Sequence, residues 1–217
     1  MYPYQSYTSM LHGMPQMWPT PCPAAPSAGI DCLSRAHVEF ANHIRMLWEQ
    51  HVAWTRLAIV SIVFGLPDTQ ATVARLLQNA PDMGAALKPF YGQQAADTYA
   101  GLIKAHLTIA AELVQAAKAK DTAQTNDART RWYANADQFI DFLDRTIYRF
   151  PKEEFRKMFY HHLAMTEAEA VTMLSGDYAA SIKQYDQIER EALEMANLIS
   201  HAIIRQFPQV FTPGIRR

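Results

Sequence analysis

The chain has few of the residues that define several common protein classes. Among 217 residues there are two cysteines, eight glycines and a formal net charge of −1. Cys22 and Cys32 are ten residues apart, whereas a structural zinc site needs closely spaced pairs. We therefore interpret both as reduced thiols of an intracellular protein. The charge is balanced and the basic residues are scattered along the chain, so no nucleic-acid partner is expected.

Long hydrophobic runs are also missing. The longest, LAIVSIVFGL at 57–66, is about half of the ~20 residues that cross a bilayer. The N-terminus has no basic segment followed by an apolar one, so we predict no signal peptide and no membrane span. The sequence thus favours a cytoplasmic protein. Spore association is the alternative, because the Tyr-, Pro- and Met-rich N-terminus is similar in composition to the tails of spore-coat proteins.

Familiar catalytic motifs are absent as well. The chain contains no G-x-G-x-x-G, no G-x-x-x-x-G-K-[ST] and no G-x-S-x-G. No glutamate is followed three residues later by histidine, which excludes the standard di-iron carboxylate bundle. We assign no catalytic residue and expect no enzyme, although an enzyme using the pocket described below is a third alternative.

Composition divides the chain into three parts. Residues 1–30 hold six of the twelve prolines and read as an extended or disordered tail. Residues 31–208 form a helical domain, and 209–217 a C-terminal tail. The N-terminal tail also carries tyrosine, methionine and tryptophan, which suggests a contact arm for a homo-oligomer or protein partner. A structural, self-assembling protein is therefore the alternative to a ligand-binding one.

The periodicity after Ser34 is helical, and no strand is predicted. We expect an all-α four-helix bundle with long helices at 34–64, 93–119, 127–148 and 178–207. Shorter helices are expected in the connections, and residues 80–92 read as a broken connection. Thr166 and Glu169 have the spacing of a capping box that starts a short helix.

Histidines on apolar helical stripes are the main functional signal. His51 and His106 lie near the middle of the first two long helices. Mid-helix residues of an up-down bundle lie at similar height, so these two side chains are predicted to share one core layer. His162 follows Phe155, Met158 and Phe159 on their apolar side. The competing interpretation is that each histidine is a hydrogen-bonded core residue that fixes the register of the bundle.

The other long helices supply polar groups at a similar height. Asn135 and Asp137 lie near the middle of the third, and a buried Arg56 needs a carboxylate partner such as Asp137 or Asp186. Imidazole with carboxylate suits Fe, Mn or Zn, and two facing histidines can ligate haem. The candidate ligand-binding residues are His51, Trp54, Arg56, His106, Trp132, Asp137, Tyr185 and Asp186. The candidate metal ligands are His51, His106, His162 and Glu189.

Several stretches, among them WEQHVAWTR, LKPFYG, AHLTIAAELVQAAKA, RWYANAD and HHLAMTEAEAV, resemble a family of small all-helical proteins from bacilli and their relatives. The resemblance spans about residues 45–208, implies an all-helical fold and carries over no functional residues. Members often bear the name acetylglutamate kinase. An amino-acid kinase needs a βαβ sandwich and glycine-rich phosphate loops, which this chain lacks. AHLTIAAE (105–112) and HHLAMTEAE (161–169) also suggest a weak internal duplication.

Overall fold

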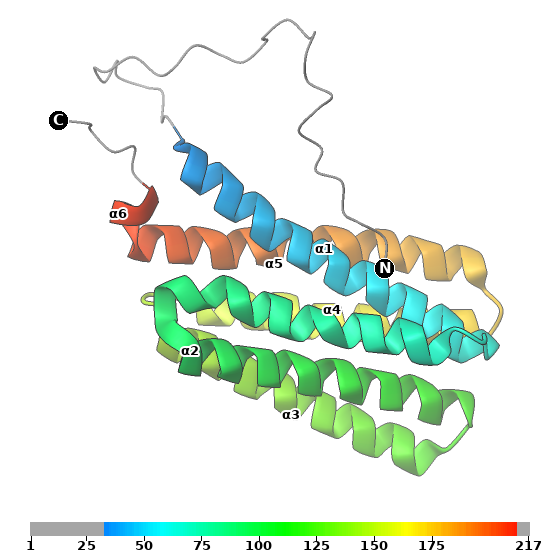
Figure 1. Cartoon of the computed structure of the whole chain (residues 1–217). Coiled ribbons are helices and arrows are strands. Elements are labelled where there is room, and N and C mark those ends of the chain that lie inside the picture. The colour runs from blue at the N-terminus through cyan, green and yellow to red at the C-terminus, as the bar shows by residue number, and fades with distance from the viewer. Residues whose placement is uncertain (1–32, 212–217) are drawn as a thin grey trace, which may run out of the picture. The chain divides into compact units, whose positions relative to one another are not determined.

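The computed structural model describes residues 33–211, and within this range the regular structure is entirely helical. The predicted all-α class is thus confirmed. The predicted N-terminal tail, 1–30, lies outside the described residues, as do both cysteines. The helices are α1 Arg35–Phe64, α2 Thr69–Lys118, α3 Thr122–Thr146, α4 Lys152–Leu174, α5 Tyr178–Gln206 and α6 Pro208–Phe211 (Figure 1).

Helix α2 consists of two arms that fold back on each other at Gly92. This residue has φ 80° and ψ 178°, a conformation that essentially only glycine adopts. The arms, 69–91 and 93–118, run antiparallel (Figure 1). They approach so closely that a Cβ on Gly84 would lie 2.6 Å from the carbonyl oxygen of Ala96 and 2.9 Å from the Ala100 Cβ. A side chain at position 84 would therefore push the two arms apart.

The prediction of a broken connection at 80–92 is wrong, because the first arm stays helical to residue 91 in spite of Pro81 and Pro89. The reason is tertiary packing. Ala80, Met83 and Leu87 are each no more than 2% exposed and belong to the main core. Burial of one face outweighs the local cost of the two prolines in a way that propensity alone does not reveal.

The six long helical segments form three consecutive hairpins. The first pairs α1 with the first arm of α2, the second pairs the second arm with α3, and the third pairs α4 with α5 (Figure 1). Contacts between α1 and α5 close the ring. The expected four-helix bundle with short helices in its connections is thus not what the structure contains. Residues 69–91 and α4, with 23 residues, are full-length members of the ring.

The three hairpin turns share one geometry. Each first helix ends at a residue with positive φ: Gly65 at 64°, Lys120 at 58° and Gly176 at 83°. At every turn, the backbone N–H of the residue that follows the positive-φ residue donates a hydrogen bond of 2.9 to 3.0 Å. The acceptor is the backbone carbonyl oxygen five residues before that donor. This is the Schellman arrangement that terminates helices. An aspartate then precedes the following helix in each hairpin: Asp68, Asp121 and Asp177.

The shared turns reveal an internal threefold repeat. In each hairpin the positive-φ residue lies 14 positions after a buried histidine, which is His51, His106 or His162. The similar stretches 105–112 and 161–169 belong to the first helices of the second and third hairpins. The first hairpin is a third copy that sequence similarity alone did not indicate.

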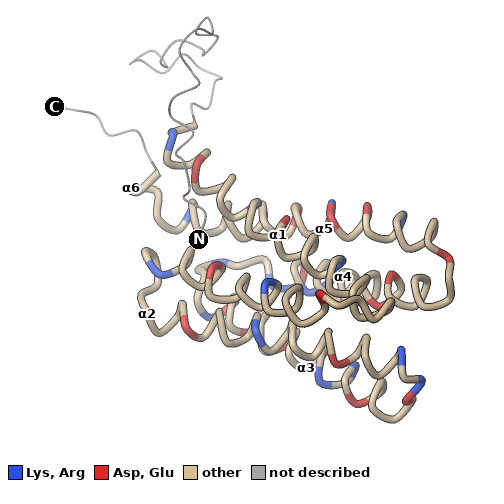
Figure 2. Tube along the Cα trace, turned by 45° about the vertical axis from the view of Figure 1, so that its right-hand side comes forward, with Lys and Arg blue, Asp and Glu red and all other residues tan. Residues whose placement is uncertain are grey.

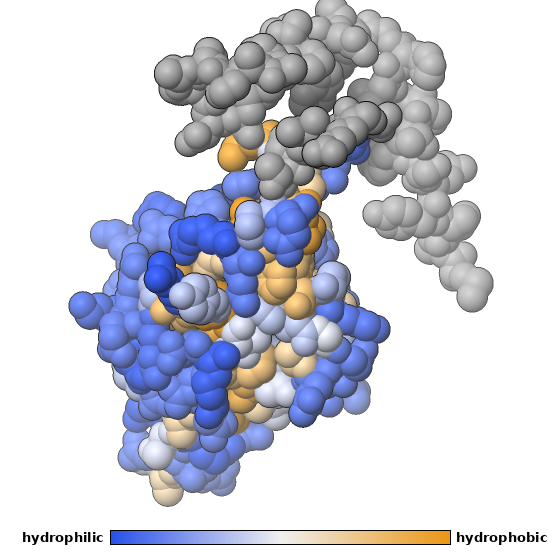
Figure 3. All heavy atoms as spheres, turned by 90° about the vertical axis from the view of Figure 1, so that its left-hand side faces the viewer, coloured by the Kyte–Doolittle hydropathy of each residue, from blue (hydrophilic) through white to orange (hydrophobic). Residues whose placement is uncertain are grey.

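At the end of the bundle near α6, several aromatic rings pack against one another. Phe90 lies between Phe40, Phe207 and Phe211, with ring centroids 5.0 to 5.7 Å away. Some hydrophobic residues reach the surface of this end among polar ones (Figure 3). Helix α6 occupies the start of the range expected as a C-terminal tail, and its Phe211 is buried. Basic and acidic residues are interspersed along the other helices (Figure 2).

Candidate metal centre

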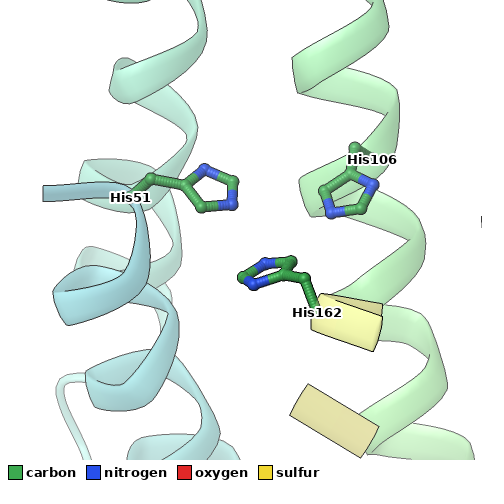
Figure 4. A group of neighbouring side chains, drawn as sticks. All are labelled: His51, His106 and His162. Carbon is green, nitrogen blue, oxygen red and sulfur yellow. The ribbon is translucent and has the colours of Figure 1, made fainter. Parts of the chain in front are cut away.

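Three buried histidines meet at the centre of the bundle. His51 comes from α1, His106 from the second arm of α2 and His162 from α4 (Figure 4). One nitrogen from each ring lies within 4.8 Å of the other two, and the side chains are 2–3% exposed. Each belongs to the first helix of its hairpin, so the internal repeat is what brings them together. The predicted shared layer for His51 and His106 is thus present, with His162 completing it.

Aromatic side chains enclose the three imidazoles. The His106 ring lies 5.2 Å from Trp132 and 5.3 Å from Phe159, centroid to centroid, in stacked geometry. Trp48 lies 5.7 Å from His51. All three large rings are about 1% exposed. The cage holds the imidazoles in place and keeps water away from them.

Asn79, on the first arm of α2, orients His51. Its Nδ2 donates to the carbonyl oxygen of Leu47 over 2.9 Å, and its Oδ1 lies 3.2 Å from His51 Nδ1. Because the amide nitrogen is committed to Leu47, the facing oxygen is the acceptor and His51 Nδ1 carries the proton. The lone pair of His51 is therefore on Nε2, which is the arrangement of a metal-binding histidine held by a neighbouring carbonyl group.

Asn135, on α3, repeats this relation beside His106. Its Nδ2 donates over 3.2 Å to the carbonyl oxygen of Leu102, which precedes His106 by four residues, as Leu47 precedes His51. Asn135 Oδ1 and His106 Nδ1 are both buried without a hydrogen-bond partner. The second hairpin thus carries the same pair of groups, in a weaker interaction that raises the pKa of His106 against the larger lowering effect of burial. The Nδ1 of His162 is likewise buried and unpaired.

Burial keeps all three imidazoles neutral near pH 7. It lowers the pKa of His51 to about 4, against a smaller raising effect of the bond to Asn79. It lowers the pKa of His162 to about 3, and repulsion from His51 adds to the effect. For His106, burial and then repulsion from the other two histidines hold the pKa well below its ordinary value. The neutral imidazole is the form that binds metal ions.

Arg56 finds a different partner from the one predicted. It donates over 2.5 Å to Glu169 and lies 5.2 Å from the centroid of the Tyr185 ring. Asp137 instead pairs with Arg156 and accepts from Tyr160 over 2.9 Å, and Asp186 is exposed on α5. The predicted pairing of Arg56 with either aspartate is therefore wrong.

The predicted capping box at Thr166 and Glu169 is also wrong, because α4 runs without a break from Lys152 to Leu174. Thr166 Oγ1 donates to the carbonyl oxygen of His162 over 2.8 Å, one turn earlier in the same helix. Glu169 is 1% exposed, and burial raises its pKa to about 7 while Arg56 opposes the shift. Its role is to pair with Arg56.

The remaining candidates lie outside the histidine cluster. Arg75 lies 4.9 Å from the Trp54 ring, and the half-buried Glu189 on α5 interacts with Glu49 on α1. Among these other candidates, Trp132 contacts the cluster, because its ring stacks on that of His106. Within residues 33–211, the group with metal-binding geometry therefore consists of three histidines and no carboxylate.

No protein-family model, curated protein or solved structure matches the chain. The resemblance to the helical family from bacilli accordingly stays a prediction. The helices described between residues 33 and 211 include none that is both long and apolar enough to cross a membrane.

Proposed function

We propose that this protein binds one transition-metal ion through His51, His106 and His162. The observation that carries the proposal is the convergence of three fully buried, neutral imidazoles from three repeated hairpins. The Nδ1 of His162 is buried with no hydrogen-bond partner, and that of His106 has none of good geometry, although the Asn135 side chain interacts with this ring. A buried nitrogen without a hydrogen-bond partner destabilises the folded state, so it is unexpected in a histidine that only packs in the core. It is expected in a metal ligand before the ion binds.

The separation of the nitrogens suits a metal ion after a small movement. Three atoms at the corners of a triangle with sides of 4.8 Å lie about 2.8 Å from its centre. A metal–imidazole bond is about 2.0–2.1 Å long. Each nitrogen therefore needs to move inward by about 0.7 Å or less, which side-chain rotation supplies without repacking the helices.

Three imidazoles with no carboxylate define the type of site. Imidazole suits Zn, Cu, Fe and Ni, and a three-histidine set leaves a tetrahedral ion one position for water or another ligand. A divalent ion would bring two uncompensated positive charges into the core, which strongly favours an anionic fourth ligand such as hydroxide. Haem suits the site poorly, because His162, Trp132 and Phe159 fill the space around the other two rings.

Metal titration of untagged protein tests the proposal. We expect one equivalent of Zn²⁺, or of Co²⁺ with its absorption bands as the signal, to bind the metal-free chain. Replacing His51, His106 or His162 with alanine should weaken binding at least about 100-fold, and glutamine at the same positions serves where alanine impairs folding. The matched control is His161→Ala, since His161 is next to His162 on α4 but 65% exposed. Equal binding by His161→Ala and the three cluster variants would reject the site.

A further inference from the structure

An apolar cavity of about 80 Å³ lies along the bundle on the hairpin-turn side of the histidines. Its walls come from α1, both arms of α2, α3 and α4. Leu107, next to His106 in sequence, and Trp132, which stacks on His106, are among the lining residues. The cavity and the histidine cluster therefore share a wall.

Threonines mark the end of the cavity nearest the cluster. Thr55 and Thr166 both line it, and each follows its histidine by four residues. Thr55 Oγ1 donates to the carbonyl oxygen of His51 over 2.7 Å, and Thr166 Oγ1 donates to that of His162 over 2.8 Å. Since one helical turn rises about 5.4 Å, the cavity begins roughly that far from the imidazoles. The two hydroxyls have already donated their protons, so they offer only acceptor positions to a ligand.

Small side chains keep the cavity open. Five of its lining residues are alanines, contributed by α1, α2 and α4. A larger apolar residue at any of these positions would fill the space. An apolar cavity of this kind stays dry and accepts small apolar molecules, as shown by an engineered cavity of about 150 Å³ that binds benzene or xenon. At about 80 Å³, the present cavity suits something smaller than benzene.

The way in lies between α3 and α4. The most exposed of the lining residues are on these two helices, where Val171 is 53% exposed and the side chain of Arg129 is 39% exposed. Arg129 Nε lies 2.9 Å and 3.0 Å from the two carboxylate oxygens of Glu167, so this ion pair spans the opening. Helices α3 and α4 also contact each other less extensively than the two helices within a hairpin do.

We propose that this cavity binds a compact, uncharged apolar molecule of about two to four heavy atoms next to the histidine cluster. Cavity binding stands on the cavity alone, whereas the role of the molecule as a ligand or substrate of the metal rests on the proposed function. The Arg129–Glu167 pair forms the entrance to the cavity.

Xenon is the probe for cavity binding. In protein with ¹³C-labelled methyl groups, dissolved xenon should shift the resonances of Ile59, Leu113 and Val114, which line the cavity. Ala58→Leu should abolish these shifts by filling the space, and Ala110→Leu serves the same purpose if the first variant does not fold. The matched control is Ala53→Leu, on the same helix but outside the lining, which should leave the shifts intact. Unchanged resonances in the wild type, or shifts that survive both filling variants, would overturn the proposal.

Cobalt loading tests how close the cavity is to the metal. Bound ¹²⁹Xe should relax several-fold faster in Co²⁺-loaded than in Zn²⁺-loaded protein, because paramagnetic relaxation falls steeply with distance. Equal relaxation with Co²⁺ bound to the histidines would overturn the link between cavity and metal. Methyl shifts in a protein that binds no Co²⁺ would reject the metal site and leave cavity binding supported, so the two proposals fail separately.

Discussion

Acidification should destabilise the metal-free protein through its three central histidines. Each is neutral in the folded chain, with a pKa lowered by burial to about 4 for His51, about 3 for His162 and well below the ordinary value for His106. In the unfolded chain each has a pKa of about 6.5. Below pH 6.5 the unfolded state therefore takes up protons that the folded state cannot. The stability from these groups is complete above pH 6.5 and falls as the pH falls toward the folded-state values.

The size of the effect follows from the three pKa differences. At pH 5, each histidine that stays neutral only in the folded state costs about 2 kcal/mol of unfolding free energy. His51 and His162 together cost about 4 kcal/mol between pH 7.5 and pH 5, and His106 adds to this loss. Glu169 acts in the opposite direction, because protonation of its carboxyl, whose pKa burial raises to about 7, stabilises the folded state by about 2 kcal/mol over the same range. The net loss of a few kcal/mol is a large part of the total stability of a domain, which is about 5–15 kcal/mol.

Urea unfolding at pH 7.5 and pH 5.0, on protein freed of metal by a chelator, measures this loss. Replacing His162 with leucine removes one buried titrating group and should reduce the loss by about 2 kcal/mol. His43→Gln alters an exposed histidine on α1 and should leave the loss unchanged. If His162→Leu loses as much stability as the wild type between the two pH values, His162 is not buried and neutral as described.

Three further substitutions test separate parts of the account. Asn79→Ala removes the acceptor that orients His51 and should weaken Zn²⁺ binding about 10–100-fold by titration; undiminished affinity would contradict its orienting role. Gly84→Ala places a Cβ 2.6 Å from a carbonyl oxygen and should lower the unfolding free energy by about 1–3 kcal/mol in urea. Its control, Gly101→Ala, meets nothing within 4 Å and should raise it by about 0.5–1 kcal/mol; equal effects would refute the close approach of the arms. Arg56→Ala removes the partner of Glu169 and should lower the unfolding free energy in urea by about 3–5 kcal/mol at pH 8. The decrease should be smaller at pH 6, where the Glu169 carboxyl is protonated. A decrease that does not depend on pH would refute the ion pair.

The helical class and the histidine layer were accessible from the sequence. The 3.6-residue periodicity is strong on the long amphipathic helices, and the bounds predicted for α1 and α5 are within a residue of those observed. His51 and His106 lie at mid-helix on apolar stripes, which is enough to place them at one height in any up-down arrangement. The topology was harder to predict. The first arm of α2 contains Pro81, Gly84 and Pro89, which are typical of helix ends, and this arm is helical because one of its faces is buried in the core.

The polar partners were harder to predict, because pairing depends on which helix face meets which neighbour. Asn79 lies just before the segment expected as a broken connection, in what was expected to be a short connecting helix, so its position beside His51 was missed. The available signal was a polar residue on the buried face, three residues after Leu76 and four before Met83. Glu169 was missed because its spacing from Thr166 fits a local cap as well as a distant ion pair with Arg56. Sequence similarity suggested two copies of the repeat, in 105–112 and 161–169. The third copy was detectable only by comparing the turns.

The most direct test of the central claim is X-ray absorption spectroscopy of untagged, zinc-loaded protein. We expect one zinc ion per chain with three imidazole nitrogens at about 2.0 Å, and loss of the imidazole signature in the His51, His106 and His162 variants but not in His161→Ala. A chain that stays free of metal, or a zinc environment that is unchanged when all three central histidines are replaced, would contradict the account. Either result would instead make the cluster a set of core residues that hold the three hairpins together.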